Sequence, residues 1–147
     1  MSTDTSKMII VMRKDLNMRK GKMIAQGSHA AVKAVLQSII SKDVHQKNNY
    51  KKEVEDLHIV TEQPDIFVSD AELDWLTGNY TKICVSVNSE QELIDVYEKA
   101  KKVNLNVCLI TDAGLTEFQG QPTKTCLAIG PDWSSKIDPI TKDLKLL

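Results

Sequence analysis

The chain has 147 residues, of which 41% are hydrophobic and 27% charged, and its formal net charge is −1. These values are typical of one soluble globular domain, and no apolar run approaches the ~20 residues that a membrane-spanning helix needs. The first residues, MSTDTSK, lack the basic-then-apolar layout of a signal peptide, so we expect a cytoplasmic protein with a single domain over residues 1–147.

Strand-like and helix-like segments alternate along the chain after an expected loose tail at residues 1–6. The expected strands are residues 7–12, 81–87, 106–111 and 123–129, the last closed by Gly130-Pro131. The expected helices are residues 22–40, a segment from Ser69 to a stop at Gly78, a segment from Ser89 to about 102, and a short turn near 133–138. Residues 41–68 form a polar excursion, either mobile or with a short helix at 48–57.

Two of these helices begin with a capping-box pattern, in which Ser69 precedes Glu72 and Ser89 precedes Glu92. Intervals of 15 or more residues between the first three strands indicate crossover connections and a largely parallel sheet. The connection to the last strand is only about 11 residues, which is short for a crossover, so that strand is predicted to be antiparallel. The fold class is therefore α/β.

The positive charge is concentrated near the N-terminus. Residues 7–33 hold seven Lys or Arg and one acidic residue, Asp15, a net charge of +6, whereas the rest of the chain holds 12 basic and 19 acidic residues. A near-neutral chain with one strongly positive segment indicates a local contact with a polyanion. The alternative is an ordinary solvated helix face.

The helix at residues 22–40 carries a polar stripe. Lys22, Gln26, His29 and Lys33 fall within an arc of roughly 60° on a helix of about 100° per residue. The complementary positions are small or apolar and are predicted to pack on the sheet: Met23, Ile24, Gly27, Ala30, Ala31, Ala34 and Val35. The polar stripe therefore faces an anion or a solvated surface.

Asp112 follows the third strand, and the basic loop follows the first. In an open α/β sheet such carboxyl ends gather ligands at one edge, so Asp112 is predicted to meet Lys22 there. Gly114 permits a tight turn that aims Thr116 back at the same cleft. A carboxylate, an ammonium group and a hydroxyl form a workable hydrolytic set. The alternative is that Asp112 only caps a turn through its backbone.

Other chemistries find less support. The three histidines show no metal-ligand spacing, and the cysteines lie in strand-like contexts that predict reduced core thiols: Cys84, Cys108 and Cys126. No P-loop, G-x-G-x-x-G or G-x-S-x-G motif is present. We therefore expect no metal and no cofactor.

Several separate segments resemble, in order, the type II peptidyl-tRNA hydrolase family. The resemblance covers the chain apart from the tail and residues 41–68. Its segments are Ile10–Ala31 (IVMRKDLNMRKGKMIAQGSHAA), Asn88–Leu93 with Tyr97–Lys101, Asp112–Glu117, Thr123–Pro131, Ile137–Asp138 and Leu144–Leu147.

The resemblance implies a three-layer α/β/α sandwich on a four-stranded mixed sheet. It implies hydrolysis of the ester between a peptide and the ribose of tRNA, with peptidyl-tRNA as substrate and no metal, cofactor, DNA or membrane partner. Members of the family are often dimeric, so a homodimer is a further expectation. The alternative is a non-catalytic RNA-binding or protein-interaction module that uses the same basic face.

By carry-over from the family, the catalytic positions are Lys22, Asp112, Thr116 and Thr125. The substrate-binding positions are the phosphate-contacting Arg13, Lys14, Arg19 and Lys20 and the adjacent Gln26 and His29. Lys33 is added to them from the polar stripe of the same helix. Three features depart from the family. Leu115 stands where an arginine is usual. Glu117-Phe118 replaces the common Gln-Ile, in a loop to Thr125 that is one residue longer. Residues 41–68 have no counterpart in the family. These departures bear on substrate range more than on fold.

Overall fold

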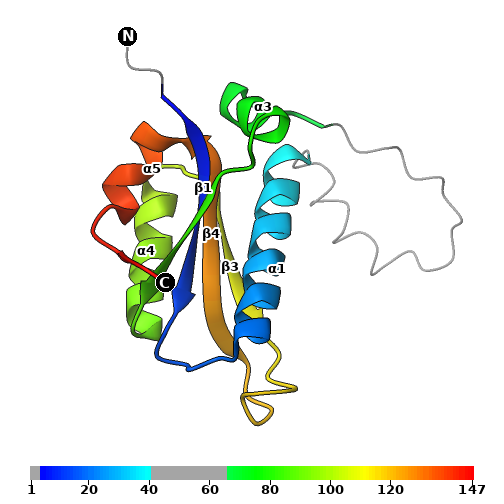
Figure 1. Cartoon of the computed structure of the whole chain (residues 1–147), viewed down its shortest axis with the longest axis vertical. Coiled ribbons are helices and arrows are strands. Elements are labelled where there is room, and N and C mark those ends of the chain that lie inside the picture. The colour runs from blue at the N-terminus through cyan, green and yellow to red at the C-terminus, as the bar shows by residue number, and fades with distance from the viewer. Residues whose placement is uncertain (1–3, 41–65) are drawn as a thin grey trace, which may run out of the picture.

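One mixed sheet lies between two sets of helices. The computed structural model describes residues 4–40 and 66–147. In chain order the elements are β1 (Ser6–Arg13), α1 (Lys20–Ile39), α3 (Asp70–Thr77), β2 (Lys82–Val87), α4 (Glu90–Lys102), β3 (Val107–Asp112), β4 (Thr123–Trp133), α5 (Ser134–Thr141) and β5 (Lys145–Leu146). Figure 1 shows α4 and α5 on one face of the sheet, with α1 and α3 on the other.

The strand directions bring three carboxyl ends to one edge. Within the described residues the order is β3-β4-β1-β2-β5, with β1 parallel to β2 and antiparallel to β4. β3 is also antiparallel to β4, so it runs in the same direction as β1. The predicted antiparallel character of the strand at residues 123–129 is confirmed. The carboxyl ends of β1, β2 and β3 all lie at the lower end of the molecule in Figure 1.

The α/β class and the mixed sheet are confirmed, whereas the predicted largely parallel sheet and the predicted number of four strands are wrong. Among the described strands only β1 and β2 pair in parallel, and the other three pairs are antiparallel. β5 adds a fifth strand by pairing Leu146 with Val85 and Lys145 with Ser86. A strand of two residues has no alternation that a sequence pattern could reveal.

The strand β4 is also longer than predicted and does not close at Gly130-Pro131. It continues to Trp133 because its last residues pair with the start of β1, Asp132 with Lys7 and Trp133 with Ser6. α5 then extends to Thr141 instead of ending near residue 138.

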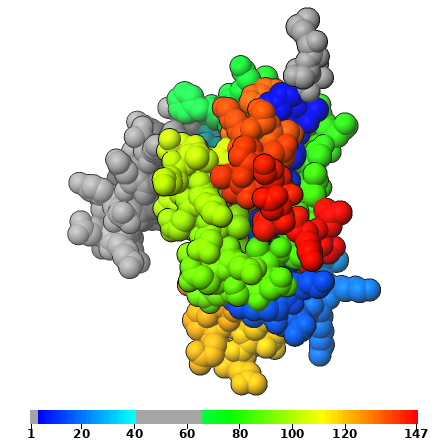
Figure 2. Space-filling view, turned by 90° about the vertical axis from the view of Figure 1, so that its left-hand side faces the viewer, coloured from blue at the N-terminus to red at the C-terminus, as the bar shows by residue number. Residues whose placement is uncertain are grey.

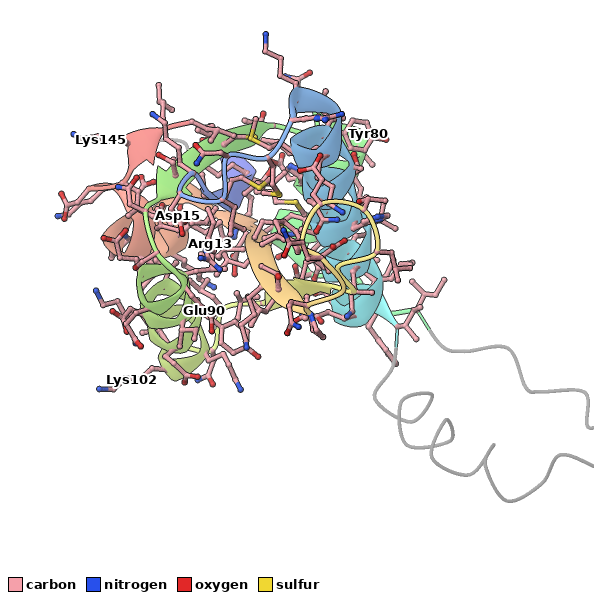
Figure 3. All side chains as sticks on the ribbon, turned by 90° about the horizontal axis from the view of Figure 1, so that it is seen from below. Arg13, Asp15, Tyr80, Glu90, Lys102 and Lys145 are labelled. Atoms are coloured by element: carbon pink, nitrogen blue, oxygen red, sulfur yellow. The ribbon has the colours of Figure 1, made fainter. Side chains whose placement is uncertain are left out.

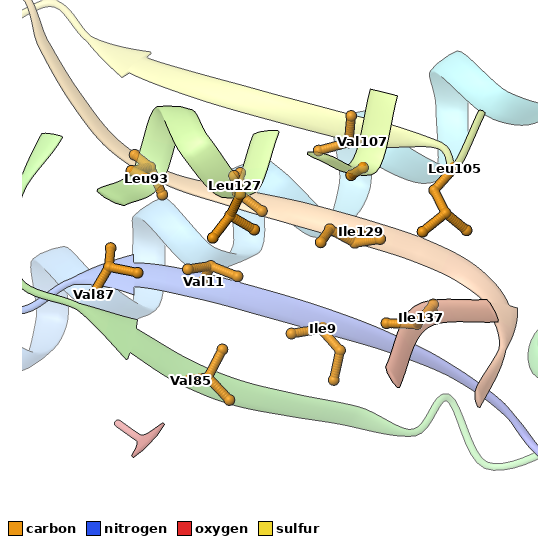
Figure 4. Packing of buried hydrophobic residues seen from close by; sticks show 12 residues of the cluster. Ile9, Val11, Val85, Val87, Leu93, Leu105, Val107, Leu127, Ile129 and Ile137 are labelled. Carbon is orange, nitrogen blue, oxygen red and sulfur yellow. The ribbon is translucent and has the colours of Figure 1, made fainter. Parts of the chain in front are cut away.

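β1 is buried on both faces, which explains its continuous apolar run. Ile9 and Val11 belong to the aliphatic cluster under α4 and α5, shown in Figure 4. Met8, Ile10 and Met12 belong to the second cluster, beneath α1 and α3. A fully buried aliphatic side chain contributes about 1.5–3 kcal/mol, so the two clusters fix the helices on both sides of the sheet.

α1 packs through small residues and covers only part of its face of the sheet. Ala30 and Ala34 are fully buried, and the helix contacts β4, β3 and β1. The prediction that Ile24 packs on the sheet is wrong, since Ile24 is 70% exposed. It projects from the flank of α1 turned toward β2, which α1 does not cover. Cys84 on β2 is exposed for the same reason, so it is not the core thiol that was predicted.

The helix caps follow the sequence closely. In the predicted box at α3, Glu72 N–H donates to Ser69 Oγ at 3.1 Å and Ser69 N–H donates to Glu72 Oε1 at 3.2 Å. At α4, Glu92 N–H donates to Ser89 Oγ, but the Glu92 carboxylate accepts from Asn88 N–H instead of Ser89 N–H. A serine cap of this kind is worth about 1 kcal/mol.

The structure answers the predictions for the N-terminal tail and for residues 41–68 only in part. Residues 4–6, predicted as part of a loose tail, are held: Ser134 N–H donates to Thr5 O at 2.8 Å, and Ser6 begins β1. Of the predicted polar excursion, residues 41–65 lie outside the described residues, while Ile66 bridges to Ile40. None of the described helices is both long and apolar enough to cross a membrane.

Candidate active site

The polar residues predicted from the sequence meet where β1, β2 and β3 end. Figure 3 looks onto this end of the molecule, with the loop after β1 and the start of α1 beside the loop after β3. In Figure 2 the segments after β1 and after β3 together form the lower end of the surface. This edge is the position at which open α/β sheets bind ligands.

Lys22 and Asp112 form the centre of the site. Lys22 Nζ donates to Asp112 Oδ1 at 2.8 Å and to Thr116 Oγ1 at 3.1 Å. Each side chain of the ion pair is 14% exposed, so the pair is largely shielded yet open on one side. The predicted meeting of Lys22 with Asp112 and Thr116 is therefore present in the structure.

Gln26 links this pair to the sheet beneath it. Its Nε2 donates to Asp112 Oδ1 at 3.2 Å, and its Oε1 accepts from Thr125 Oγ1 at 2.6 Å. A reversed amide would direct its oxygen at the Asp112 carboxylate, which accepts only, so the carboxylate fixes the amide orientation. Thr125 has no exposed surface and Gln26 is 4% exposed. Thr125 thus contacts the site through Gln26 and does not face a substrate.

Asp112 both caps a turn and pairs with Lys22. The two alternatives drawn from the sequence, a site carboxylate and a turn cap, are therefore both present. Its Oδ2 accepts a hydrogen bond from Gly114 N–H at 2.9 Å, while its Oδ1 accepts hydrogen bonds from Lys22 Nζ and Gln26 Nε2. Gly114 has φ +81°, and a Cβ there would lie 2.3 Å from Gln121 O. Glycine is required at this position, and the resulting turn places Thr116 beside Lys22.

The surroundings of Asp112 keep it charged. The hydrogen bond from Lys22 lowers the pKa of Asp112 from its ordinary value, against the opposite effect of burial, and the bonds from Gly114 and Gln26 add to the lowering. A carboxylate offers about four lone-pair positions, and three donors occupy three of them. One acceptor position remains for a water molecule or a substrate donor.

Phe118 also lies at the site. In the sequence it stands out only because Glu117-Phe118 replaces the family's usual Gln-Ile. Its ring lies beneath Lys22 Nζ, 5.5 Å from the ammonium nitrogen to the ring centroid. Such a contact attracts the ammonium group and restricts its position. No periodicity or motif in the sequence could have placed this ring, because it lies in an irregular loop.

The predicted phosphate-binding Arg13 is engaged inside the protein. Its guanidinium pairs with Asp15 at 2.7 Å, donates to Lys124 O at 3.0 Å and lies 3.6 Å from Glu90. Figure 3 shows Arg13 between the labelled Asp15 and Glu90. With its charge compensated in this way, Arg13 is expected to fasten the loop after β1 instead of binding a phosphate.

The other predicted binding residues are exposed and follow two directions from the site. Lys14, Arg19 and Lys20 lie in the loop after β1 and in the first turn of α1, while His29 and Lys33 lie further along α1. The positive charge of residues 7–33 is not all gathered here, since Lys7 at the other end of β1 pairs with Asp138. The basic surface at the site is therefore smaller than the charge count of the segment implies.

Thiol and metal chemistry find no support in the described residues. Burial raises the pKa of Cys126 to about 11 and also raises the pKa of Cys108, so both remain protonated thiols near neutral pH. No group of three His, Cys, Asp or Glu side chains suited to a metal ion occurs among residues 4–40 and 66–147.

The fold and this site define a class: an α/β protein with a lysine–carboxylate–hydroxyl cluster at the carboxyl edge of its sheet. Comparisons with known proteins identify the family within that class. Residues 6–147 match the model of the family described as peptidyl-tRNA hydrolase PTH2. The chain belongs to this family.

Curated relatives agree over nearly the whole length. A peptidyl-tRNA hydrolase of Methanocaldococcus jannaschii is 41% identical over 141 residues, covering 96% of this chain and 99% of the relative. Peptidyl-tRNA hydrolases of Saccharolobus islandicus and Saccharolobus solfataricus are each 40% identical, covering 96% of this chain and 98% of the relative. A solved structure of a protein of unknown function from Agrobacterium tumefaciens matches with a TM-score of 0.53 at 12% identity, covering 97% of both chains, which concerns the fold alone.

Proposed function

We propose that this chain hydrolyses the ester bond of peptidyl-tRNA, the activity that gives its family its name, at the Lys22–Asp112 site. The observation that carries the proposal is the cluster of Lys22, Asp112 and Thr116 at the carboxyl edge of the sheet. It lies beside the exposed Lys14, Arg19 and Lys20, which are suited to tRNA phosphates.

The remaining acceptor position of Asp112 positions the attacking water. The lowered pKa makes Asp112 a weak base, so its main contribution is to hold and polarise the water rather than to remove its proton early. The water oxygen bonds to the ester carbonyl carbon, and the bond from that carbon to the ribose oxygen breaks. One proton of the water ends on the ribose oxygen, and the other is released to solvent when the new carboxylic acid ionises. The products are free tRNA and a peptide with a carboxylate.

Lys22 stabilises the negative charge that develops in this step. Two of its three ammonium protons point to Asp112 and Thr116, which leaves one for the carbonyl oxygen. Thr116, which is exposed, can orient the ester, whereas the buried Thr125 acts only by fixing the Gln26 amide. A preformed donor at a developing oxyanion is commonly the largest single contribution to catalysis.

The test is the release of free tRNA from a purified N-acetyl-aminoacyl-tRNA, with and without EDTA. We expect cleavage that EDTA does not reduce, because the proposed step uses only side chains of this chain. Absence of cleavage by well-folded protein that still binds tRNA would instead support a non-catalytic RNA-binding module. Cleavage abolished by EDTA and restored by a divalent ion would contradict the proposed role of Asp112 and Lys22.

Thr125→Val tests the link from the sheet to the site. Valine keeps the shape but leaves Gln26 Oε1 buried without its donor, so we expect the free energy of unfolding to fall by about 1–3 kcal/mol. A misplaced Gln26 should lower kcat by about 10- to 100-fold with little change in KM. Thr125→Ser, which keeps the hydroxyl, is the control and should retain most of the kcat. Loss of kcat in Thr125→Ser, with kcat retained in Thr125→Val, would show that the methyl group, and not the hydrogen bond, matters.

Leu115→Arg tests the departure from the family at the tip of the loop after β3. Leu115 is 88% exposed and next to Thr116, so an arginine there is free to reach a phosphate. We expect tighter tRNA binding and a plot of log affinity against log salt steeper by about one unit. Val103→Arg, at an exposed position beyond the end of α4, adds the same charge away from the site and should leave that slope unchanged.

A further inference from the structure

A groove runs from the proposed active site along α1. It has a volume of about 800 Å³, within the range of pockets that hold drug-sized ligands, and four aliphatic and five polar or charged residues line it. The groove lies between the outer side of α1 and the last residues of β3. Its lining includes His29, Val32, Lys33 and Leu36 from α1, and Ile110 and Thr111 from β3.

The groove is lined by close neighbours of the site residues along the chain. Thr111 immediately precedes Asp112, and His29 lies one helical turn after Gln26, which donates to Asp112 Oδ1. The polar stripe of α1 therefore continues from the catalytic residues into the groove. Any chain attached at the ester carbonyl next to Asp112 and leaving along α1 would enter here.

Among the described strands, the one beside the groove has an unpaired outer edge. β3 is the outermost strand on its side of the described sheet and pairs with β4 alone. Near the start of β3, Gln37 Nε2 donates to Val107 O at 2.8 Å, which leaves residues 108–112 as the stretch beyond this contact. Such an edge presents backbone N–H and C=O groups to an extended peptide.

We propose that this groove holds the peptide part of the peptidyl-tRNA substrate as an extended strand against the edge of β3. The inference rests on the proposed function and deepens it. Because the peptide is esterified through its C-terminus, that end lies at Asp112 and the peptide runs parallel to β3. The distance along α1 from His29 to Ile40 is about 16 Å, which spans about five extended residues.

The chemistry fits a substrate whose sequence varies. Main-chain hydrogen bonds to a strand edge do not depend on side chains, and an aliphatic wall accepts many apolar residues. His29 and Lys33 are exposed donors suited to peptide carbonyl groups. Peptide length, more than peptide sequence, should therefore raise the rate.

A second apolar groove lies on the opposite flank of α1 and provides a control. It is lined by Met23, Ile24 and Gly27 of α1 and by Lys82 and Cys84 of β2. The body of α1 separates it from Asp112, which Lys22 and Gln26 approach from the β3 side. A peptide leaving the ester toward this groove would have to pass around the start of the helix.

The experiment compares two substrates with the same tRNA and the same last residue, an N-acetyl-aminoacyl-tRNA and an N-acetylated six-residue apolar peptidyl-tRNA. The readout is the ratio of kcat/KM for the long substrate to that for the short one, so an effect on tRNA binding cancels. Leu36→Glu and Val32→Glu place a charge in the groove at positions 47% and 60% exposed, where glutamate favours the helix and folding is preserved. Ile24→Glu, 70% exposed, is the matched control.

We expect the wild type to prefer the long substrate, and Leu36→Glu and Val32→Glu each to lower the ratio by about tenfold, the effect of losing one buried aliphatic contact. Ile24→Glu should leave the ratio unchanged. An unchanged ratio in both groove variants, or a fall confined to Ile24→Glu, would overturn the inference while leaving the hydrolase activity in place. If the wild type is a dimer and the groove variants are monomers with an unchanged ratio, the groove would bind a second copy of this chain instead of the peptide. Failure of the wild type to cleave either substrate would overturn the proposed function and this inference with it.

Discussion

Asp112→Asn should lower kcat for N-acetyl-aminoacyl-tRNA by about 10²- to 10⁴-fold, the range for loss of a group that positions or activates water. Asparagine keeps the size of the side chain but has one acceptor oxygen in place of two. Lys22 and Gln26 both donate to Oδ1 and Gly114 donates to Oδ2, so the variant cannot satisfy all three donors. It also presents an N–H group where the water should be held.

Binding of the tRNA should survive this change. The phosphate-contacting candidates Lys14, Arg19 and Lys20 do not depend on Asp112 for their placement, and removal of a negative charge does not weaken attraction to a polyanion. The measurement is therefore paired: release of tRNA in a single-turnover assay, and affinity for deacylated tRNA in the same buffer.

Asp138→Asn is the matched control, because it removes the carboxylate of another lysine–aspartate pair, Lys7 with Asp138, at the opposite end of β1. It should leave kcat within about twofold, as expected of a surface ion pair away from the chemistry. An Asp112→Asn protein that folds normally and retains wild-type kcat would remove Asp112 from the mechanism.

The sequence was sufficient to predict that Lys22, Asp112 and Thr116 lie together, because strand direction and turn geometry fix their positions. Parallel strands separated by crossovers bring their carboxyl ends to one edge, and glycine at position 114 marks the tight turn after Asp112. These rules act through the backbone and survive changes in side-chain packing. The same applies to the serine caps of α3 and α4.

The sequence could not place Thr125, Arg13 or β5, because their environments are set by residues far along the chain. β4 is central and buried on both faces, so no alternation tells whether Thr125 faces a substrate or the underside of Gln26. From the sequence alone, Arg13 is predicted to be free to bind a phosphate. Folding brings Glu90 and Lys124 O beside its guanidinium and engages it inside the protein. β5 forms only because β2 offers it an edge.

These differences change how the site is understood. The cations that the sequence grouped into one patch divide into four kinds. Lys22 lies in the proposed catalytic pair and Arg13 holds the loop after β1. Lys7 pairs with Asp138 at the other end of β1, and side chains such as Lys20 are exposed. A count of charges cannot make this division, whereas hydrogen-bond geometry can. The proposed catalytic part of the site then reduces to one ion pair, one amide and one exposed hydroxyl.

Lys22→Met should have the second large effect, through two separable consequences. Methionine keeps much of the length and apolar stem but has no ammonium group, so the proposed oxyanion donor is lost. We expect kcat to fall by about 10²- to 10³-fold, as when one such donor is removed. Lys136→Met, a change at a lysine 63% exposed on α5, is the control and should leave kcat unchanged.

The second consequence concerns the pH dependence. The hydrogen bond from Lys22 is the largest cause of the lowered pKa of Asp112, and burial acts in the opposite direction. In the wild type the carboxylate therefore stays ionised as the pH falls below its ordinary pKa of 3.8, and the stability it contributes is lost only as the pH falls through the lowered value. Without Lys22, burial is opposed only by the bonds from Gly114 and Gln26, and the pKa should rise.

The residual activity of Lys22→Met should accordingly decline at a higher pH than that of the wild type, which should be flat through the weakly acidic range. The carboxyl ¹³C chemical shift of Asp112, followed by NMR against pH, measures the same pKa without requiring turnover. A titration of Asp112 at the same pH in both proteins would show that Lys22 does not control its charge. Activity lost together with an unchanged Asp112 titration would confine Lys22 to the oxyanion, whereas a raised pKa with near-normal kcat would confine it to holding the carboxylate.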